Sequence, residues 1–551
     1  MSVSVQATFC ATLVDEWSRQ GVTDAVVCPG SRSTPLALAL AERLTVHVRL
    51  DERSAAFYAL GLAMATGRPT VICTTSGTAA VELHPAVVEA HHGHVPLVVC
   101  TADRPPELQQ VGAPQTVDQV GLFGSAIRWA ADPGVPDESQ QATWRPMAAR
   151  AVAEATAGPL GPGPVHLNLA FREPLTGDPG PLPARPAPTI SGTTGAAADA
   201  PDLDGRGLLV AGAGATRHPE RLLALGRALG WPVLADPRSG CRLPGTVAAA
   251  DAVVRTERPL PACIVVLGAP WLSKALAAYV EAAALAGARV IAVDPWWQWT
   301  DPARVVSQFH HGDPDQFIEQ AMAAAPASLD GAWLAGWMAD EARAQAAIEA
   351  TLGRDLNEPG VARLVAGHAA ERGATIVVSA SMPMRDLEWY SPALAAPPRV
   401  LANRGANGID GVVSTAFGVA ASGVPTVALL GDLAFLHDVS GLVNLDQHSP
   451  CTFVVLDNGG GGIFSFLPQA DALVPTRFEQ LFGTPPTSDV AAVARGFGLT
   501  VHEVDDPEHL AAALGHIGEP GPSLIRVRVP SRADNVVLHE AINEAVRVAL
   551  A

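Results

Sequence analysis

The stretch TVALLGDLAFLHDVSGLVNLDQHSPCTFVVLDNGGGG (426–462) decides the fold of this chain. It holds two short apolar runs rich in β-branched residues, and a stretch long enough for a helix separates them. Each run ends in polar residues, Gly431-Asp432 after the first and Asp457-Asn458 with four glycines after the second. A strand, a crossover helix and a second strand form one βαβ unit, which predicts a parallel α/β sheet.

The two polar strand ends are expected to converge at one edge of the sheet. Asp432 and Asn458 are 26 positions apart, a distance that one βαβ unit covers while returning to the same edge. A carboxylate, an amide oxygen and a backbone carbonyl would form a hard oxygen site suited to Mg²⁺, with Mn²⁺ as the alternative ion. Two unrelated βα turns are the other interpretation, because Gly and Asp favour turns in any case.

The same alternation of strand and helix runs through most of the chain. Strands are predicted at 24–28, 45–49, 70–74, 97–101, 207–212, 263–268, 289–294, 375–380, 426–432, 452–458 and 523–529. We therefore predict an α/β fold with three doubly wound parallel-sheet domains at 1–180, 207–345 and 346–551, and a Pro- and Gly-rich linker at 181–206. Ligands of such sheets bind at the carboxyl ends of the strands, so the residues after each strand are the candidate site residues.

Composition excludes several classes of function. With 48% hydrophobic residues the chain can bury several cores, so it is not a disordered protein. A net charge of -19 argues against binding to nucleic acids and to anionic membranes. The sequence offers no apolar stretch for stable membrane insertion, no CxxC pair among its cysteines and no leader signature, so we expect a cytoplasmic protein.

The strand-end strings together resemble a known family. GDLAFLHDVSGL (431–442), LDNGGGGIFSFLP (456–468) and CPGSRSTPL (28–36) are similar to motifs of thiamine diphosphate enzymes, and among these to the SEPHCHC synthase family of menaquinone biosynthesis. The resemblance implies the thiamine diphosphate-binding fold, with thiamine diphosphate as the cofactor.

The resemblance also assigns residues to the diphosphate and the metal ion. Gly431 and Asp432 open the diphosphate motif, while Asp432, Asn458 and the Gly460 carbonyl would hold the ion. Two positions depart from the family pattern. Leu433 stands where glycine is usual, and Gly459 stands where the family often has Asn, so Gly459 is not counted as a ligand.

Glu52 is the candidate for activating the cofactor. In RLDERSAAFYALGLA (49–63) it follows a strand and starts a helix, where an acidic residue complements the helix dipole whatever its function. The resemblance implies a catalytic role, in which its carboxyl group bonds a ring nitrogen of the aminopyrimidine and so promotes loss of the thiazolium C2 proton. Ile409, in NRGANGIDG (403–411), would hold the cofactor bent and Ile463 would contact it; a core isoleucine is the alternative for Ile409.

The quaternary structure follows from the same resemblance. The family builds each site from two chains, because the glutamate and the metal loop lie in different domains. A homodimer is therefore implied, and a homotetramer is common in the family.

Cations after strands of the first domain are candidates for binding an acid. Ser31 and Arg32 follow one strand, and Arg104, in TADRPPEL (101–108), follows another. The resemblance adds Gln115 as a catalytic and substrate-binding residue, and it aims this group at isochorismate. Pro114 replaces the usual Asn, so any side-chain contact from that position is lost. Surface arginines at a helix start are the alternative.

Further candidates lie in the other two domains. Ser381 and Arg385 are four positions apart, so a helix would put them on one face. The resemblance implies that they bind the distal carboxylate of 2-oxoglutarate together with Arg404, and surface charges are the alternative for each arginine. Lys274, the only lysine of the chain, would face isochorismate, although Ala275 replaces the family's following Arg. The apolar wall under the isochorismate ring would comprise Ile463, Phe464 and Leu467, for which core packing is the alternative.

The resemblance implies a transferase. The cofactor's ylid would attack 2-oxoglutarate, CO₂ would leave, and the succinyl carbanion would add in a 1,4 sense to isochorismate. The product would be SEPHCHC, 2-succinyl-5-enolpyruvyl-6-hydroxy-3-cyclohexene-1-carboxylate. Two alternatives stay open. Another thiamine-dependent decarboxylase or carboligase would need neither Arg385 nor Arg404, and a catalytically silent paralogue would serve as a binding or regulatory subunit.

Overall fold

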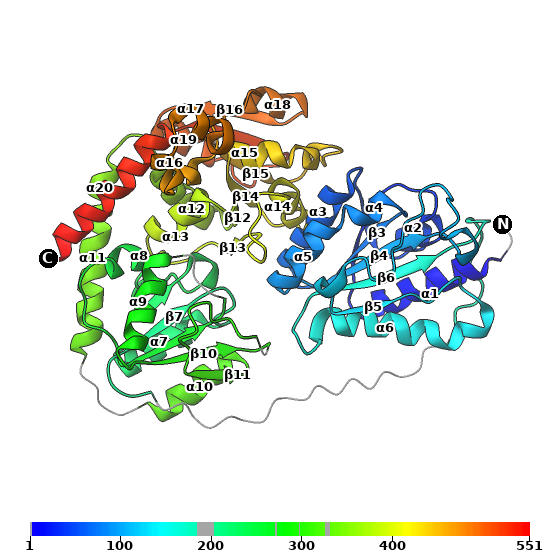
Figure 1. The fold of residues 1–551 in the computed structure, drawn as a ribbon, viewed down its shortest axis with the longest axis horizontal. Coiled ribbons are helices and arrows are strands. Elements are labelled where there is room, and N and C mark those ends of the chain that lie inside the picture. The colour runs from blue at the N-terminus through cyan, green and yellow to red at the C-terminus, as the bar shows by residue number, and fades with distance from the viewer. Residues whose placement is uncertain (1–2, 185–202, 270–272, 297, 326–330) are drawn as a thin grey trace.

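Three parallel sheets, each flanked by helices, make up the protein (Figure 1). The computed structural model describes residues 3–184, 203–269, 273–296, 298–325 and 331–551. The three predicted doubly wound units are confirmed, and most of the predicted linker at 181–206 lies outside the described residues. The domain boundaries remain predictions, and the one at 345/346 falls inside helix α11 (Ala332–Leu352).

The N-terminal domain contains a six-stranded sheet in the order β2-β1-β3-β4-β6-β5. Its strands are β1 (Asp24–Val27), β2 (Thr45–Val48), β3 (Thr70–Thr74), β4 (Leu97–Asp103), β5 (Trp129–Ala131) and β6 (Pro164–Ala170). Its α-helices are α1 (Val5–Arg19), α2 (Thr34–Ala41), α3 (Glu52–Thr66), α4 (Thr78–Val81), α5 (His84–Gly93) and α6 (Gln141–Ala157). Separate apolar clusters cover the two faces of the sheet, so its interior strands are buried on both sides.

The central domain has five strands in the order β11-β10-β9-β7-β8. They are β7 (Gly207–Ala211), β8 (Val233–Ala235), β9 (Cys263–Leu267), β10 (Arg289–Asp294) and β11 (Gln308–His311). The helices are α7 (Pro219–Leu229), the 3₁₀ turn η4 (Pro237–Ser239), α8 (Ala250–Val254), α9 (Lys274–Leu285) and α10 (Pro314–Ala324), with α11 leading out of the domain.

The C-terminal domain repeats the topology of the first one, with the order β13-β12-β14-β15-β17-β16. Its strands are β12 (Thr375–Val378), β13 (Val400–Leu401), β14 (Thr426–Gly431), β15 (Cys451–Asp457), β16 (Thr500–Val504) and β17 (Ser523–Arg528). Its longer helices are α12 (Glu358–Arg372), α13 (Met382–Tyr390), α14 (Val412–Ala421) and α20 (Arg532–Leu550), and its shorter ones are α15 (Asp432–His437), η5 (Val439–Leu442), η6 (Gly462–Phe466), α16 (Gln469–Ala472), α17 (Pro475–Phe478), η7 (Glu479–Gly483), α18 (Val490–Gly496) and α19 (Pro507–Leu514).

This shared strand order fixes where ligands can bind. In both domains the chain leaves one strand in one direction and the adjacent strand in the other, at β1/β3 and at β12/β14. Such a switch point opens a crevice at the carboxyl edge of the sheet. The loops after β1, β3, β12 and β14 are therefore the places where the fold presents functional groups.

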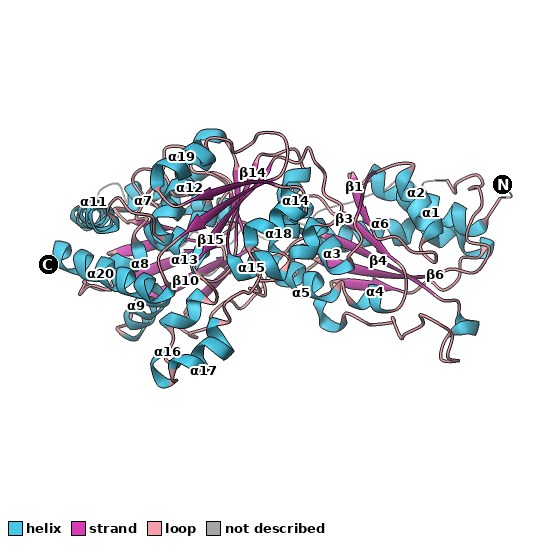
Figure 2. Ribbon diagram, turned by 90° about the horizontal axis from the view of Figure 1, so that it is seen from above, coloured by secondary structure: helices cyan, strands magenta, loops and turns pink. Residues whose placement is uncertain are grey.

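The N- and C-terminal domains share one apolar core through α3 and α14, which lie side by side between the two sheets (Figure 2). A Cβ atom on Gly61 of α3 would lie 2.1 Å from the Thr415 carbonyl oxygen. A Cβ atom on Gly418 of α14 would lie 2.1 Å from the Tyr58 carbonyl oxygen. The two helices can cross this closely only because both positions lack side chains.

The central domain is attached to the C-terminal domain by a buried arginine. Arg242 is 3% exposed. It donates to the backbone carbonyls of Leu387, Glu388 and Ser391 at the end of α13. Close to these bonds, α8 of the central domain contacts α13 and η4 contacts β13. None of the helices in the described part of the chain is long and apolar enough to cross a membrane.

Every predicted strand is present, with ends that differ by a few residues at most. The prediction missed β5, β8, β11, β13 and β16, which are short or lie at sheet edges, and it missed the central strand β6. β6 reads PVHLNLA, and its His166 and Asn168 are buried polar residues that interrupt the apolar run. A buried strand that carries such a polar network lacks the usual hydrophobic signal.

Candidate active site

The loops after β14 and β15 meet, as the spacing of their polar residues predicts. β14 pairs with β15 in parallel as far as Gly431 and Leu456, so Asp432 and Asn458 follow at the same edge. The Asp432 carboxylate accepts hydrogen bonds from the backbone N–H of Gly460, at 2.8 Å, and of Leu433, at 2.6 Å. The backbone of the glycine run thus closes directly onto the carboxylate.

Gly460 is required by this geometry. Its φ of 128° is unfavourable for a side chain, and a Cβ atom there would lie 2.1 Å from the Gly483 carbonyl oxygen. The run after β15 is therefore a tightly packed turn without side chains, in which Gly460, Gly461 and Gly462 are buried and no side chain bars a phosphate group from the edge of the sheet.

The donor set at this edge fits a hard divalent cation. The Asn458 side chain donates from Nδ2 to Glu358 at 2.8 Å, which fixes the orientation of the amide. Its Oδ1 is buried and finds no hydrogen-bond partner among the residues that the structure describes. Burial raises the pKa of Asp432 to about 6, a cost that a cation beside the carboxylate would offset. These observations favour a metal site over two unrelated turns.

Glu358 was not among the predicted site residues. It begins α12, a hundred positions before its partner Asn458, and it is 2% exposed. Burial, together with the charge of Asp386, raises the pKa of Glu358 to about 8. Asn357-Glu358-Pro359 signals only a helix start, so the sequence contains no sign of this contact.

Glu52 is the first residue of α3, and Asp51 caps the helix by accepting from the Ser54 N–H at 2.9 Å. The pKa of Glu52 is raised by partial burial and by the charges of Asp51 and Glu82. A residue that only complemented the helix dipole would have a lowered pKa. Burial, together with the nearby charge of Glu52, raises the pKa of the Cys28 thiol, so Glu52 lies close to the end of β1.

The start of α3 also contacts the C-terminal domain of the same chain. Ser54 and Ser440 share a hydrogen bond of 2.7 Å between their hydroxyl groups. Arg53 donates to the carbonyl of His437 at 3.1 Å. These contacts involve α15, which begins at Asp432, and η5, which follows α15.

The structure brings Arg32, Arg104 and Gln115 together at the carboxyl edge of the first sheet. Arg104 donates to Ser76 Oγ at 2.9 Å and to the Pro114 carbonyl at 3.3 Å. Its pKa is lowered by burial and by the charge of Arg32. An anion beside Arg104 would offset the unfavourable effect of burial and of the Arg32 charge on its guanidinium group.

Gln115 is held in an unusual backbone conformation beside this pair. Its φ is 57°. Gln115 Nε2 donates to the Ser76 carbonyl at 3.0 Å, and Ser76 Oγ donates to the Gln115 carbonyl at 2.8 Å. Ser76 was not predicted, although TSGTA after β3 could have indicated it. Ser31 is exposed beside Arg32. At position 114 the backbone carbonyl of Pro114 accepts a hydrogen bond from Arg104.

Arg385 and Arg404 also converge, at the start of α13. Arg385 donates to the Ser381 carbonyl at 2.7 Å, and Ser381 is the N-cap of α13, so the two residues meet through a backbone bond at the helix start and not along one helical face. Ser381 has a φ of 82°, a strained conformation at the β12/β14 switch point. The pKa of Arg404 is lowered by burial, by Arg238 and by Arg385.

Arg238, on η4 of the central domain, is a third cation of this group that sequence reasoning did not find. It bonds Asp236 through Nη2 at 2.8 Å. Nothing in the PRSG string distinguishes it from a turn arginine, so only the docking of the central domain identifies it.

Lys274 lies exposed at the first position of α9, where the helix dipole disfavours a cation. The preceding Ser273 donates its N–H to Glu388 of α13 at 3.3 Å. Lys274 therefore projects from the seam between the central and C-terminal domains, near the helix that carries Arg385. Residues 270–272 lie outside the described part of the chain.

The predicted apolar contacts are not core residues. Ile409 is 38% exposed, which excludes the alternative of a core isoleucine. Ile463, Phe464 and Leu467, on and after η6, are each only partly buried. Exposed apolar groups beside a polar loop fit a ligand or a partner surface better than packing.

Comparison with known proteins gives a consistent result along the whole chain. Family models match residues 8–122 (thiamine pyrophosphate enzyme, N-terminal TPP binding domain), 201–376 (middle domain of thiamine pyrophosphate) and 388–527 (thiamine pyrophosphate enzyme, C-terminal TPP binding domain). A 2-succinyl-5-enolpyruvyl-6-hydroxy-3-cyclohexene-1-carboxylate synthase from Thermobifida fusca is 43% identical over 98% of each chain. Proteins of the same name from Chloroflexus aurantiacus and Geobacillus kaustophilus are 41% and 40% identical, over 98% of this chain and 96% and 98% of theirs.

Proposed function

Because this chain belongs to the 2-succinyl-5-enolpyruvyl-6-hydroxy-3-cyclohexene-1-carboxylate (SEPHCHC) synthases, a family of thiamine pyrophosphate enzymes, we propose that it forms SEPHCHC in menaquinone biosynthesis. As a transferase it decarboxylates 2-oxoglutarate and adds the remaining succinyl unit, in a 1,4 sense, to isochorismate. One observation carries this assignment. Two separate groups of arginines, Arg32 with Arg104 and Arg385 with Arg404, accompany one candidate cofactor site, and the reaction joins two different acids.

The C-terminal domain would hold the diphosphate and its metal ion. Asp432, Asn458 and the Gly460 carbonyl are the proposed ligands of Mg²⁺, or of Mn²⁺. Gly431, at the end of β14, and Ile463, on η6, are the proposed cofactor contacts beside them. When bound, thiamine diphosphate supplies a nucleophilic carbon and an electron sink for the decarboxylation. The buried Oδ1 of Asn458, with no bond to any described residue, is the observation that supports the metal assignment.

The chain's own residues then have distinct proposed roles. Glu52, whose pKa is raised by partial burial, would exchange a proton with a ring nitrogen of the aminopyrimidine. Ser381, Arg385 and Arg404 bind the distal carboxylate of 2-oxoglutarate, since paired guanidinium groups match a carboxylate. Isochorismate would be bound by Ser31, Arg32, Arg104, Gln115 and Lys274, and its ring would rest on Phe464 and Leu467.

A direct assay tests the proposed reaction. Purified protein with thiamine diphosphate, Mg²⁺ and both acids is expected to consume isochorismate and release CO₂ in equal amounts, followed by chromatography and CO₂ trapping. CO₂ release without loss of isochorismate would point to another decarboxylase. No turnover by folded protein that binds thiamine diphosphate, as followed by circular dichroism, would contradict the substrate pair.

We further propose that each site is assembled from two chains. The first domain exposes large apolar side chains near its carboxyl edge, including Leu50 at 57% and Val120 at 59%, and Ile409 is exposed in the C-terminal domain. Apolar groups of this number at a site edge fit a homodimer interface, and a tetramer can follow from a second such contact.

Mixing two inactive variants tests this assembly. Glu52→Gln and Asp432→Asn each disable a different half of the site. If the halves come from different chains, a refolded equimolar mixture contains mixed dimers with one intact site each, and about a quarter of the wild-type activity should return. If both halves came from one chain, no mixed dimer would hold an intact site, and the mixture would stay inactive. Either unmixed variant, treated in the same way, is the control.

A further inference from the structure

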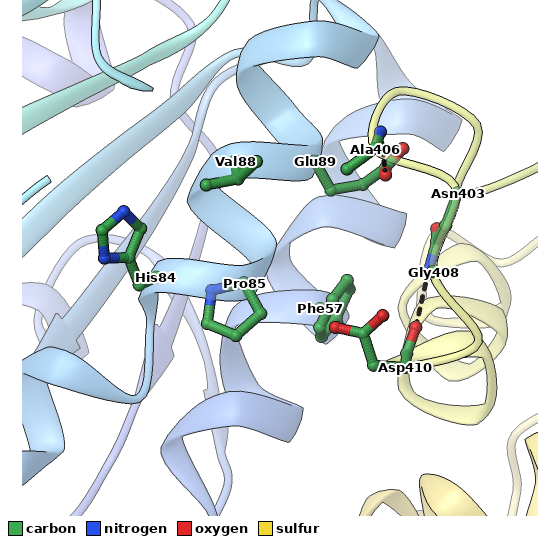
Figure 3. A pocket seen from close by; sticks show the side chains of 9 residues that line it. All are labelled: Phe57, His84, Pro85, Val88, Glu89, Asn403, Ala406, Gly408 and Asp410. Carbon is green, nitrogen blue, oxygen red and sulfur yellow. Dashed lines mark hydrogen bonds between the residues drawn. The ribbon is translucent and has the colours of Figure 1, made fainter. Parts of the chain in front are cut away.

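A carboxylate from the N-terminal domain holds the loop that carries Arg404 and Ile409. Glu89 on α5 is 4% exposed and accepts hydrogen bonds from the backbone N–H groups of Gly405 at 2.6 Å, Ala406 at 2.7 Å and Asn407 at 3.3 Å. Figure 3 shows the Glu89 side chain reaching from its helix to the loop at Ala406. Three successive N–H groups that converge on one carboxylate form an anion-binding nest.

The loop backbone is shaped for this contact. Asn407 has a φ of 69°, and a Cβ atom on Gly405 would lie 2.6 Å from both the Glu89 carbonyl oxygen and the Gly93 nitrogen. The segment therefore lies directly on α5, with its N–H groups facing the helix. A buried carboxylate is costly without such donors, so the bonds are specific rather than incidental.

The rest of the loop borders a cavity. A cavity of about 360 Å³ lies behind it, lined among others by Phe57, His84, Val88 and Asp410 (Figure 3). Within the loop, Asn403 Nδ2 donates to the Asp410 carbonyl at 3.3 Å and closes the segment on itself. Beside this cavity, the Glu89 carboxylate ties the 405–407 backbone to α5 through three hydrogen bonds.

The two flanking residues have proposed roles in the reaction. Arg404 directly precedes the three clamped residues, and Ile409 follows them by two positions. A displacement of the clamp would move both side chains, because a loop this short transmits it to both ends. Geometric shifts of about 1 Å at such groups are enough to weaken catalysis.

We propose that Glu89 is a positioning residue that sets Arg404 for the 2-oxo acid and Ile409 for the cofactor. The inference rests on the proposed function of these two residues. In the two-chain assembly proposed above, the N-terminal domain would then act on both sites: its Glu52 completes the site of the neighbouring chain, and its Glu89 shapes the site of its own.

Glu89→Gln tests the proposal, because an amide has one acceptor oxygen and presents an N–H group to the donors. The KM for 2-oxoglutarate is expected to rise about 5- to 20-fold, while the KM for isochorismate changes less than about twofold. In the protein without ligands, the amides of residues 405–407 should exchange with solvent faster. Glu16→Gln is the matched control, since Glu16 is an equally buried carboxylate of the same domain, bonded to Gln20 and Arg145 far from the loop.

The possible results are distinguishable. Unchanged amide exchange and an unchanged KM in a folded Glu89→Gln protein would overturn the proposal. Arg404→Met is measured in parallel: if it leaves the KM for 2-oxoglutarate unchanged, the role of Arg404 is wrong, while the exchange data still decide whether Glu89 holds the loop. If Glu89→Gln does not fold, the same measurements are made on Glu89→Asp, which keeps the charge on a shorter side chain and should show the same shifts in smaller measure.

Discussion

Replacing Glu52 with glutamine is expected to lower kcat by about 10²- to 10⁴-fold, the range that a positioned proton-transfer group contributes. The amide keeps the size and the hydrogen-bonding capacity of the carboxyl group but cannot exchange a proton with the aminopyrimidine nitrogen. Because Glu52 is only partly buried at a helix start, the fold should persist, with an unchanged thermal midpoint. Initial rates of isochorismate loss, at saturating cofactor, measure the effect.

A neighbouring carboxylate provides the control for this variant. Glu82 is exposed, and its charge contributes to the raised pKa of Glu52. Glu82→Gln removes a charge from the same edge of the sheet and should leave the rate within about threefold. Decarboxylation that survives Glu52→Gln intact would show that the proton at the cofactor ring is held by another group.

Replacing Arg385 with methionine is expected to raise the KM for 2-oxoglutarate about 10- to 100-fold, since a charge-assisted bond to a carboxylate is lost. Methionine keeps most of the length and the apolar contacts of arginine. A 2-oxo acid without the distal carboxylate, such as 2-oxopentanoate, should be nearly unaffected, because it never used the guanidinium group. The ratio of kcat/KM for the two acids is the quantity to measure.

Arg372→Met is a suitable comparison, because Arg372 is an exposed arginine in the last turn of α12, away from the loops of the site. Arg372→Met should leave kcat/KM unchanged for both acids. Equal loss of both acids in Arg385→Met would mean that Arg385 supports the fold of α13 rather than substrate choice. No loss of either acid would favour a thiamine-dependent enzyme with a different donor substrate.

The two polar strand ends show what a sequence can predict about a site. Asp432 and Asn458 could be placed together because strand, helix and strand have narrow length ranges and return the chain to one edge. The same logic placed Arg32 and Arg104 at the edge of the first sheet, where the pKa of Arg104 reflects its neighbour. Residues directly after strands are thus within reach of sequence reasoning, and the assignment of their roles depended on the family resemblance.

Contacts between elements distant in sequence were beyond that reasoning. Glu358 reaches Asn458, Arg238 reaches Arg404, and Glu89 reaches the 405–407 backbone, in each case from an element distant in sequence. Neither periodicity nor spacing encodes how one domain docks on another. The strand β6 was missed for a related reason, since its buried His166 and Asn168 make sense only beside partners such as Thr101.

The sequence by itself determined three doubly wound parallel sheets, the positions of the candidate groups at strand ends and, through its motifs, the thiamine diphosphate family. Those features depend on the spacing of apolar residues along the chain and on the narrow length ranges of strands and connecting helices, and both can be read from consecutive residues. Only the tertiary structure decided that Ile409 is exposed, that Arg238 lies near Arg404, and that Glu89 binds the loop backbone after Arg404. These depend on close packing between surfaces of different domains, whose free energy is gained only when the whole chain has folded.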